Sequence, residues 1–215
     1  MCNRYVSPDE AAMERAWHIG RHNQPKWARE VYPRALGPFL RAKASAPYDL
    51  VVGVWGLIPA WAKTARLAYA TNNARSEELS DKPTFRDAWK KGQRCIIPAM
   101  SFDEPNWESG RNVWWRFYRA DGLPWGLAGL WNTWVDRTTG EIVESYTMLT
   151  VNADAHPLMS RMHKPDPQLP ADQQDKRSVV AIESGDVDQW MLGSMEEIKP
   201  LLRAPAMKQI LCGPV

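Results

Sequence analysis

Cys2, the second residue of the chain, carries the most informative chemistry in the sequence. A small side chain at this position permits removal of Met1 in cells, which would leave Cys2 with a free α-amine beside its thiol. The amine can form an imine with an aldehyde, and the thiol can then close a five-membered thiazolidine ring. Free α-amines titrate near pH ~7.7–8.0 and thiols near ~8.5, so reactive forms of both exist at neutral pH. The alternative is that Cys2 is an incidental residue at a frayed terminus.

Three later polar residues can act with Cys2: Asn73, Glu104 and His163. Each has an ordinary explanation when taken alone. Asn73 suits a turn or a helix cap, and Glu104 lies in the stretch 103–106, whose composition is typical of a turn. His163, like His156, can be an exposed loop residue. The presence of all three after a cysteine at position 2 favours a reactive site.

Six short motifs follow one another from residue 2 to about residue 182. They are Met-Cys-Asn-Arg (1–4), Trp-Gly-Leu-Ile-Pro-Ala-Trp (55–61), Asn-Ala-Arg-Ser-Glu (73–77), Arg-Cys-Ile-Ile-Pro-Ala (94–99) leading to Glu104, Ala-Gly-Leu-Trp (128–131), and a late histidine. In this order they resemble the SRAP family, the SOS-response-associated peptidase fold, whose members cross-link covalently to abasic sites in single-stranded DNA. The resemblance implies the same fold and activity for this chain.

The resemblance also implies a role for each catalytic candidate. Cys2 matches the N-terminal nucleophile, and Asn73 matches the asparagine that holds the abasic-site sugar and the N-terminal residue. Glu104 matches the catalytic glutamate near the α-amine. His163 matches the late histidine that moves protons, with His156 as the competing candidate. The chemistry agrees, because an attacking amine must first lose a proton to a carboxylate or imidazole, and histidine suits the acid that expels water at neutral pH.

Arg4, Arg75 and Arg86 match positions that contact DNA phosphates, which a guanidinium can grip with two parallel bonds. Arg75 has the alternative of a surface ion pair of little energetic value. Trp61 can stack against the unstacked bases that flank an abasic site, and Thr150 is placed with these DNA-binding candidates. The expected partner is single-stranded DNA containing abasic sites. We expect the protein to act as a monomer, away from membranes and without a metal or other cofactor.

The chain departs from the family pattern at three places. Asn3 stands where the family has glycine, and asparagine is the next most tolerant residue of left-handed backbone conformations. Pro105 stands where the family has a tryptophan after the glutamate, which changes the local wall of the site. Residues 164–176, after His163, are rich in proline, aspartate and glutamine. They are interpreted as an inserted surface loop that returns to the same strand.

The expected reaction joins the abasic aldehyde to the Cys2 amine as an imine, which the thiol then closes to a stable thiazolidine. Because an imine also leads to β-elimination, weak lyase activity is expected, as is autoprocessing of Met1. Two alternatives stay open. One is a cysteine peptidase with Cys2 as its N-terminal nucleophile, which would turn over peptides. The other is a module that binds single-stranded DNA without a covalent bond.

The elements that must position these residues are helical at the two ends of the chain and strand-like in the middle. A helix is expected from Pro8, with Ser7 as its cap and Glu10 completing a capping box, to about residues 19–20. Further helices are predicted over 85–91, 186–192 and 195–202, the last with a Ser194–Glu197 capping box, before a loose C-terminal tail. Strands are predicted over 50–58, 94–98, 113–118, 125–135, 142–151 and 178–182. This order indicates an α+β fold with a mixed, mostly antiparallel, barrel-like sheet flanked by helices.

Composition sets the outer limits of these expectations. The 215 residues are enough to bury a core and are interpreted as one domain over residues 2–215. The net charge of +2 excludes a global basic field, so DNA binding would need a local groove. Most of the twelve tryptophans are expected in the core. Three widely spaced cysteines argue against disulfides and a zinc site. With no signal peptide and no apolar run of ~20 residues, they predict a cytoplasmic protein, nucleoid-associated when bound to DNA.

Overall fold

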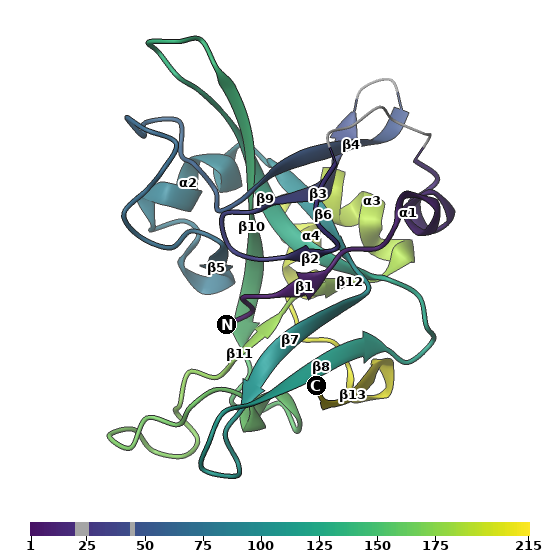
Figure 1. Cartoon of the computed structure of the whole chain (residues 1–215), viewed down its shortest axis with the longest axis vertical. Helices are drawn as coiled ribbons and strands as arrows, with labels where there is room; N and C mark the ends of the chain where they lie inside the picture. Colours follow the sequence, from purple (N-terminus) through teal and green to yellow (C-terminus); the bar gives the residue numbers. More distant parts are fainter. Residues whose placement is uncertain (20–25, 44–45) are drawn as a thin grey trace.

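The computed structural model describes residues 1–19, 26–43 and 46–215 (Figure 1). In this part of the chain the α-helices are α1 (Glu10–Trp17), α2 (Pro83–Lys90), α3 (Val187–Leu192) and α4 (Met195–Ile198). The strands are β1 (Tyr5–Val6), β2 (Glu30–Val31), β3 (Leu36–Lys43), β4 (Ala46–Trp55), β5 (Asn73–Arg75), β6 (Arg94–Ala99), β7 (Ser101–Asn106), β8 (Val113–Arg119), β9 (Trp125–Val135), β10 (Ile142–Asn152), β11 (Arg177–Val179), β12 (Ala181–Ile182) and β13 (Ile210–Pro214). None of the described helices is long and apolar enough to cross a membrane.

Five strands of the larger sheet close into a barrel. β10 pairs with β4, β4 with β3, β3 with β6, β6 with β9, and β9 returns to β10. The β10–β4 pairing is parallel and the other four are antiparallel. Gly129 allows close packing, since a Cβ there would lie 2.6 Å from the Thr147 carbonyl oxygen and 2.8 Å from Cys95 Sγ. The predicted α+β fold with a mixed, mostly antiparallel barrel is confirmed.

A second, five-stranded sheet carries the first residues of the chain. Its order is β13-β8-β7-β1-β2, and every pairing is antiparallel. Tyr5 of β1 lies opposite Phe102 of β7 on one side and Val31 of β2 on the other. The N-terminal segment is therefore anchored between two strands, and the alternative of a frayed terminus is wrong.

Two other expectations for this sheet are wrong. The turn considered for residues 103–106 is the second half of β7, because each of these residues pairs with a residue of β8. Here pairing with a neighbouring strand outweighs a composition that is poor in strand-forming residues. The C-terminal segment does not end as a loose tail, because Ile210–Pro214 forms β13 against β8. β3, which pairs with β4 along its whole length, has no predicted counterpart.

The first helix has a different cap from the expected one. α1 begins at Glu10, and the carboxylate of its N-cap Asp9 accepts the Ala12 N–H at 2.7 Å. Ser7 is buried instead, and its hydroxyl accepts the Trp27 indole N–H at 2.9 Å. The helix thus starts two residues later than predicted, and residue 20 of its expected end lies outside the described residues.

The remaining predicted elements match more closely. β9 has the predicted bounds, and β6, β8 and β10 each extend one residue beyond theirs. β4 lies earlier than 50–58, and the predicted strand 178–182 is divided into β11 and β12. α2 begins at Pro83 because proline suits the first position of a helix. The capping box of Ser194 and Glu197 is confirmed, and residues 164–173 are exposed in a loop, as expected of an insertion.

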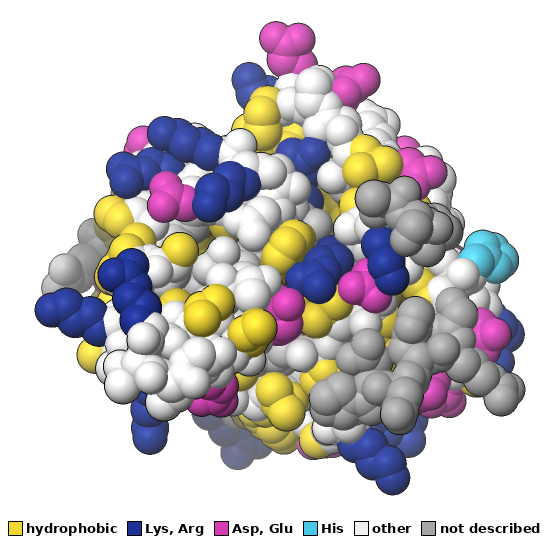
Figure 2. All heavy atoms as spheres, turned by 90° about the horizontal axis from the view of Figure 1, so that it is seen from above, with side chains coloured by type: hydrophobic (Ala, Val, Ile, Leu, Met, Phe, Trp, Pro, Cys, Tyr) yellow, Lys and Arg dark blue, Asp and Glu magenta, His cyan; other side chains and the backbone are white. Residues whose placement is uncertain are grey.

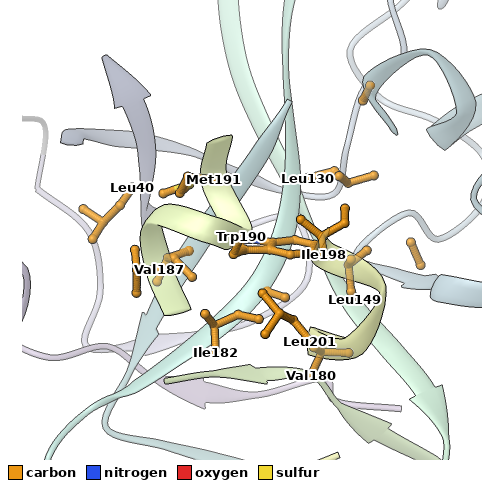
Figure 3. Close-up of a cluster of buried hydrophobic side chains, with 14 of the residues drawn as sticks. Leu40, Leu130, Leu149, Val180, Ile182, Val187, Trp190, Met191, Ile198 and Leu201 are labelled. Atoms are coloured by element: carbon orange, nitrogen blue, oxygen red, sulfur yellow. The ribbon is translucent and has the colours of Figure 1, made fainter. Parts of the chain in front are cut away.

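Two apolar cores hold the layers together. In one, helices α3 and α4 pack on the barrel around the fully buried ring of Trp190 (Figure 3). The other draws on the barrel and the N-terminal sheet and contains Cys2, Tyr5 and Trp55. Of the twelve tryptophans, six are buried, four are partly buried, and Trp61 and Trp114 are exposed, so only half of them, and not most as expected, lie in the core.

Candidate active site

Cys2 is fully buried in the second core, three residues before β1. Its thiol donates a hydrogen bond to the Arg4 carbonyl oxygen, 3.3 Å away. The Cys2 carbonyl oxygen accepts from Asn73 Nδ2 at 2.6 Å, which fixes the backbone next to the thiol. Burial raises the pKa of the Cys2 thiol well above its usual range, and the Glu104 carboxylate adds to the shift. The sulfur is therefore held as a neutral thiol.

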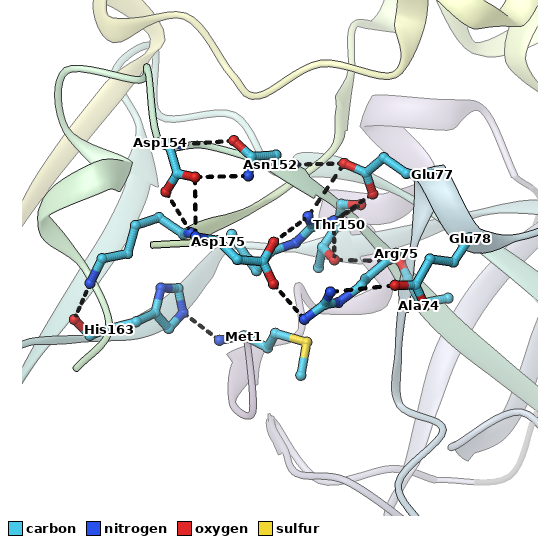
Figure 4. Close-up of polar contacts among 12 residues, drawn as sticks. Met1, Ala74, Arg75, Glu77, Glu78, Thr150, Asn152, Asp154, His163 and Asp175 are labelled. Atoms are coloured by element: carbon cyan, nitrogen blue, oxygen red, sulfur yellow. Dashed lines mark hydrogen bonds and ion pairs between the residues drawn. The ribbon is translucent and has the colours of Figure 1, made fainter. Parts of the chain in front are cut away.

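The N-terminal amine, which belongs to Met1 in this structure, faces an acid–base pair. It contacts His163 Nε2 and lies 3.6 Å from Glu104 Oε2 (Figure 4 draws the Met1–His163 contact). His163 Nε2 is in turn 2.8 Å from the same Glu104 oxygen. Burial raises the pKa of Glu104, but the N-terminal ammonium and His163 outweigh it, so the pKa is lowered overall. Glu104 therefore remains a carboxylate at neutral pH.

The position of Glu104 follows from its place in β7. Successive side chains of a strand point to opposite faces, so Glu104 and its neighbour Asp103 meet different partners. Asp103 accepts two hydrogen bonds from Arg116, at 2.8 and 2.9 Å, and lies 3.2 Å from Arg4 Nε. Arginines thus neutralise Asp103, and Glu104 is left to face the amine and His163.

Main-chain pairing brings His163 to this strand. Met162 forms a β-bridge with Asn106, and the His163 N–H donates to the Pro105 carbonyl oxygen at 2.6 Å. Pro105, which departs from the family pattern, therefore still supplies the acceptor that holds the histidine. His163 itself has a φ of 64°, in the left-handed region.

His156, the competing candidate, is engaged elsewhere. Its Nδ1 accepts the main-chain N–H groups of Leu158 and Met159, at 3.2 and 3.0 Å. Its Nε2 lies 3.0 Å from the Pro205 carbonyl oxygen. Both ring nitrogens are therefore used in holding a loop, and it is His163 that the structure brings to Glu104.

Two consecutive asparagines complete the surroundings of Cys2. Asn73 is placed by the parallel pairing of β5 with β10. Asn72 donates to the Asn3 side-chain oxygen at 3.0 Å and lies 3.5 Å from the Cys2 carbonyl oxygen. Asn73 Oδ1 and His163 Nδ1 are both buried and have no hydrogen-bond partner among the described residues, which is rare for polar atoms inside proteins.

Two of the expected phosphate-binding arginines are already paired with carboxylates. Arg4 bonds Glu30 at 2.8 Å as well as contacting Asp103. Arg75, whose side chain is 40% exposed, lies 2.5 Å from Asp175 of the inserted loop (Figure 4). A phosphate group would have to compete with these carboxylates for either guanidinium.

The other three DNA-binding candidates are spread more widely. Trp61 is 51% exposed, and its indole N–H donates to the Pro83 carbonyl oxygen at 3.3 Å. Pro83 begins α2, the helix that also carries Arg86, whose side chain is 44% exposed and whose Nε lies 3.8 Å from Asp87 Oδ1. Thr150 is 1% exposed and its hydroxyl lies 3.4 Å from Arg177, so it faces the interior. The structure thus brings Cys2, Asn73, Glu104 and His163 together beside Arg4, while Trp61 and Arg86 lie at α2.

A cavity of about 730 Å³ adjoins this site. Asn3 and Asn72 form its border with Cys2, and Arg34, Arg66 and Tyr69 contribute to its other walls. On the face seen from above in Figure 2, basic side chains are interspersed with acidic and apolar ones. Within the described ranges, no group of three or more His, Cys, Asp or Glu residues is placed to hold a metal ion.

Sequence reasoning missed three residues that contact the candidates. Asn72 touches Cys2 and Asn3, Asp175 holds Arg75, and Lys176 donates to the His163 carbonyl oxygen at 2.7 Å. The doubled asparagine at 72–73 was a visible signal for the first. No local pattern marks Asp175 and Lys176, because their contacts depend on how the inserted loop folds back.

The family model of the SOS response associated peptidase (SRAP) proteins matches residues 1–215, the whole chain. The chain belongs to the SRAP family. SRAP relatives include "Abasic site processing protein YoqW" of Bacillus subtilis, 35% identical over 123 residues that cover 57% of this chain and 53% of the relative. "Abasic site processing protein HMCES" of Gallus gallus is 26% identical over 172 residues, covering 62% of this chain and 51% of the relative. The chain spans about half the length of the curated relatives it matches.

Solved structures agree with the SRAP assignment. A crystal structure of a Bordetella bronchiseptica protein has a TM-score of 0.88 and 34% identity, and the match covers 100% of this chain and 99% of that one. A Bacteroides thetaiotaomicron structure has a TM-score of 0.78 at 22% identity, covering 100% of this chain and 92% of that one. At that identity the second match shows a shared fold alone.

Proposed function

We propose that this SRAP protein processes abasic sites in single-stranded DNA by forming a covalent adduct through Cys2. One observation carries the proposal: Asn73 holds the Cys2 carbonyl beside a contact group of Glu104, His163 and the amine of Met1, the residue whose removal would expose the Cys2 amine. The substrate class is taken from relatives named abasic site processing proteins. An abasic site offers the aldehyde that an amine and a thiol can capture together.

The first step is formation of an imine. After removal of Met1, the neutral Cys2 amine attacks the aldehyde carbon, and a carbon–nitrogen bond forms while the carbonyl oxygen takes a proton. Loss of one water then gives the imine. Glu104 and His163, 2.8 Å apart, can take the proton from the amine and return one to the departing oxygen. Asn73 Oδ1, buried and unpaired, is free to accept a hydroxyl of the opened sugar.

The second step closes the ring. Cys2 Sγ bonds to the imine carbon, and the thiol proton ends on the nitrogen, so no oxidant or reductant is needed. Because burial holds Cys2 as a thiol, a base must receive its proton as the sulfur attacks, and Glu104 and His163 are the groups at hand. Loss of a proton from the sugar at the imine stage would instead cleave the DNA, and it would give the protein a weak lyase activity. Hydrolysis of the adduct would reverse both steps.

The surface around the site would recognise the DNA strand. Arg4 and Arg75 border it and can bind phosphates once the phosphates displace the carboxylates that now pair with these arginines. Trp61 presents an exposed indole on which an unstacked base can lie. We place the single strand across these side chains, with the abasic nucleotide at Cys2.

Intact mass spectrometry tests the proposal on the protein alone and after incubation with single-stranded DNA that holds one abasic site. We expect a mass that lacks Met1, and an added mass equal to the DNA minus one water. Cys2→Ala should abolish the adduct. Cys212→Ala, which removes a partly exposed cysteine outside the site, should leave the adduct unchanged. An adduct that forms equally in Cys2→Ala would overturn the proposal.

The same experiment separates the alternatives. Adducts that are trapped only with borohydride would identify a lyase that stops at the imine. DNA binding without any adduct would indicate a binding module. Turnover of peptide substrates that depends on Cys2, in the absence of any DNA adduct, would point to a peptidase.

A further inference from the structure

His163 has a backbone conformation that needs support. Its φ of 64° lies in the left-handed region, which is uncommon for residues other than glycine, although asparagine, aspartate and histidine adopt it more often than the rest. The imidazole must nevertheless be placed accurately, since it contacts the N-terminal amine and lies 2.8 Å from Glu104. The N–H group of His163 is held by its hydrogen bond to the Pro105 carbonyl oxygen. The carbonyl group of His163 is held by Lys176.

Lys176 is a buried lysine whose ammonium meets the main chain of His163. The residue is 7% exposed, and Nζ donates to the His163 carbonyl oxygen at 2.7 Å. Burial lowers the pKa of Lys176, and the nearby Asp154 carboxylate opposes that shift. Lysines are seldom buried in this way without a specific partner. Here the partner is His163, whose left-handed backbone directs the chain toward the site.

The main chain of Lys176 is fixed as firmly as its side chain. Its N–H donates to Asp154 Oδ1 at 2.8 Å, and its carbonyl oxygen accepts from Ala153 at 2.6 Å. The adjacent Asp175 N–H is held by the other Asp154 oxygen at 3.1 Å. Lys176 is thus anchored to the end of β10, part of the barrel, and its side chain extends from this anchor to His163.

We propose that Lys176 is a positioning residue that fixes the left-handed turn at His163 and so keeps the imidazole against Glu104 and the N-terminal amine. The role in catalysis rests on the proposed function, whereas the placement of the imidazole does not. Lys176 lies at the far end of the loop 164–176 and ties it back to His163, the residue that precedes the loop. A shift of the imidazole by about one ångström would be enough to interrupt proton transfer between the amine, Glu104 and His163, because reacting groups must be held closely in line.

Lys164 supplies a matched control. It follows His163 directly, lies in the same loop and is exposed, with its ammonium 5.4 Å from the Trp107 ring centre. Lys176→Met and Lys164→Met remove the same charge from the same segment. Only the first removes the bond to His163.

Two measurements on Lys176→Met, Lys176→Arg and Lys164→Met test the proposal. Long-range ¹H–¹⁵N spectra of the histidine rings report which nitrogen of His163 carries the proton, and single-turnover assays give the rate of adduct formation at saturating DNA. For Lys176→Met we expect a changed His163 signature and a rate lowered at least tenfold, with DNA affinity unchanged. Lys164→Met should match the wild type, and Lys176→Arg, which keeps a charged donor, should recover most of the rate.

Several results would overturn the proposal. A wild-type His163 signature in Lys176→Met would overturn it, even if the rate of adduct formation falls. An equal fall of that rate in Lys164→Met would also overturn it. If thermal unfolding shows that Lys176→Met does not fold, Lys176→Gln, whose amide ends one atom short of Nζ, replaces it with the same expected results. If no protein forms adducts at all, the cross-linking function fails, while the spectra still decide whether Lys176 positions His163.

Discussion

Two carboxylates stand side by side in β7 and have different partners. Asp103 is surrounded by the guanidinium groups of Arg116 and Arg4, whereas Glu104 meets only groups that can exchange a proton. A carboxylate against an amine and an imidazole can take up a proton during a reaction. The difference between these neighbours comes from strand alternation.

The Glu104→Gln variant tests this difference. We expect adduct formation to slow by about 10²-fold, within the range typical of a lost acid–base group, because an amide cannot take the amine proton. Single-turnover rates at pH 7 measure the effect. Glu108→Gln, which removes an exposed carboxylate that pairs with Arg161, should leave the rate unchanged. Equal rates for Glu104→Gln and the wild type would remove Glu104 from the mechanism.

Glu104 also predicts a dependence of stability on pH. Its pKa in the folded protein is lowered from 4.5, so the ionised carboxylate stabilises the fold. This contribution is fully present above pH 4.5 and is lost as the pH falls through the lower folded value. Thermal unfolding between pH 7 and pH 3 should therefore show the wild type losing more stability than Glu104→Gln. Parallel curves for the two proteins would contradict the lowered pKa.

At the scale of elements, the loop 164–176 brings a carboxylate onto a candidate phosphate-binding group. Asp175 lies 2.5 Å from Arg75 and 3.1 Å from Arg177. A DNA phosphate must displace it to reach Arg75. We expect Asp175→Asn to bind single-stranded DNA about two- to fivefold more tightly, the equivalent of an exposed ion pair worth up to ~1 kcal/mol.

Fluorescence anisotropy over a range of salt concentrations measures this change, since a further phosphate contact steepens the salt dependence. Asp172→Asn is the matched control, because it removes the same charge from the exposed part of the same loop. If both variants gain affinity equally, the effect is one of net charge, and the pairing of Asp175 with Arg75 does not limit binding.

The sequence predicts some elements well for reasons that are local. β9 and β10 are apolar stretches bounded by turn residues, and their bounds match to within one residue. β7 and β13 are missed because Asp103–Asn106 and Gly213-Pro214 have turn-like compositions, and only pairing with β8 makes them strands. Barrel closure depends on the parallel β10–β4 contact between distant segments, which no local pattern contains.

In the candidate site, too, some features have a local signal in the sequence and others depend on contacts between distant segments. Cys2, Asn73, Glu104 and His163 each lie in a motif, so the family resemblance is enough to single them out. Their convergence needs the fold, because it joins the ends of three separate strands and one loop. The supporting contacts of Lys176 follow from the course of an irregular segment, for which composition predicts only exposure.

At the scale of the whole molecule, the last strand closes the edge of the sheet that holds the N-terminus. β13 pairs with β8 over five residues, and Ile210 and Cys212 pack against the core that contains Cys2. Deleting residues 210–215 should cost about 2 kcal/mol, close to one buried aliphatic side chain. The melting temperature should then fall by roughly 4–8 °C for a chain of this size.

Differential scanning calorimetry measures this change, with deletion of Val215 alone as the control, since it removes an exposed residue beyond the strand. An unchanged melting temperature after removal of the whole segment would mean that β13 adds no stability. A broad, two-step transition would show that the N-terminal sheet and the barrel unfold separately.

The anchoring of β1 between β7 and β2 has a mechanical consequence. Whatever becomes attached to Cys2 is attached to a buried residue three positions before a strand that is paired on both sides, and not to a loose end. A pull on that attachment is resisted by hydrogen bonds to both neighbours at once. A protease that cuts at exposed loops would leave the attached residue inside the folded body. Release by force or digestion would therefore require the sheet itself to come apart, whereas hydrolysis of the proposed adduct would release the DNA from the folded protein.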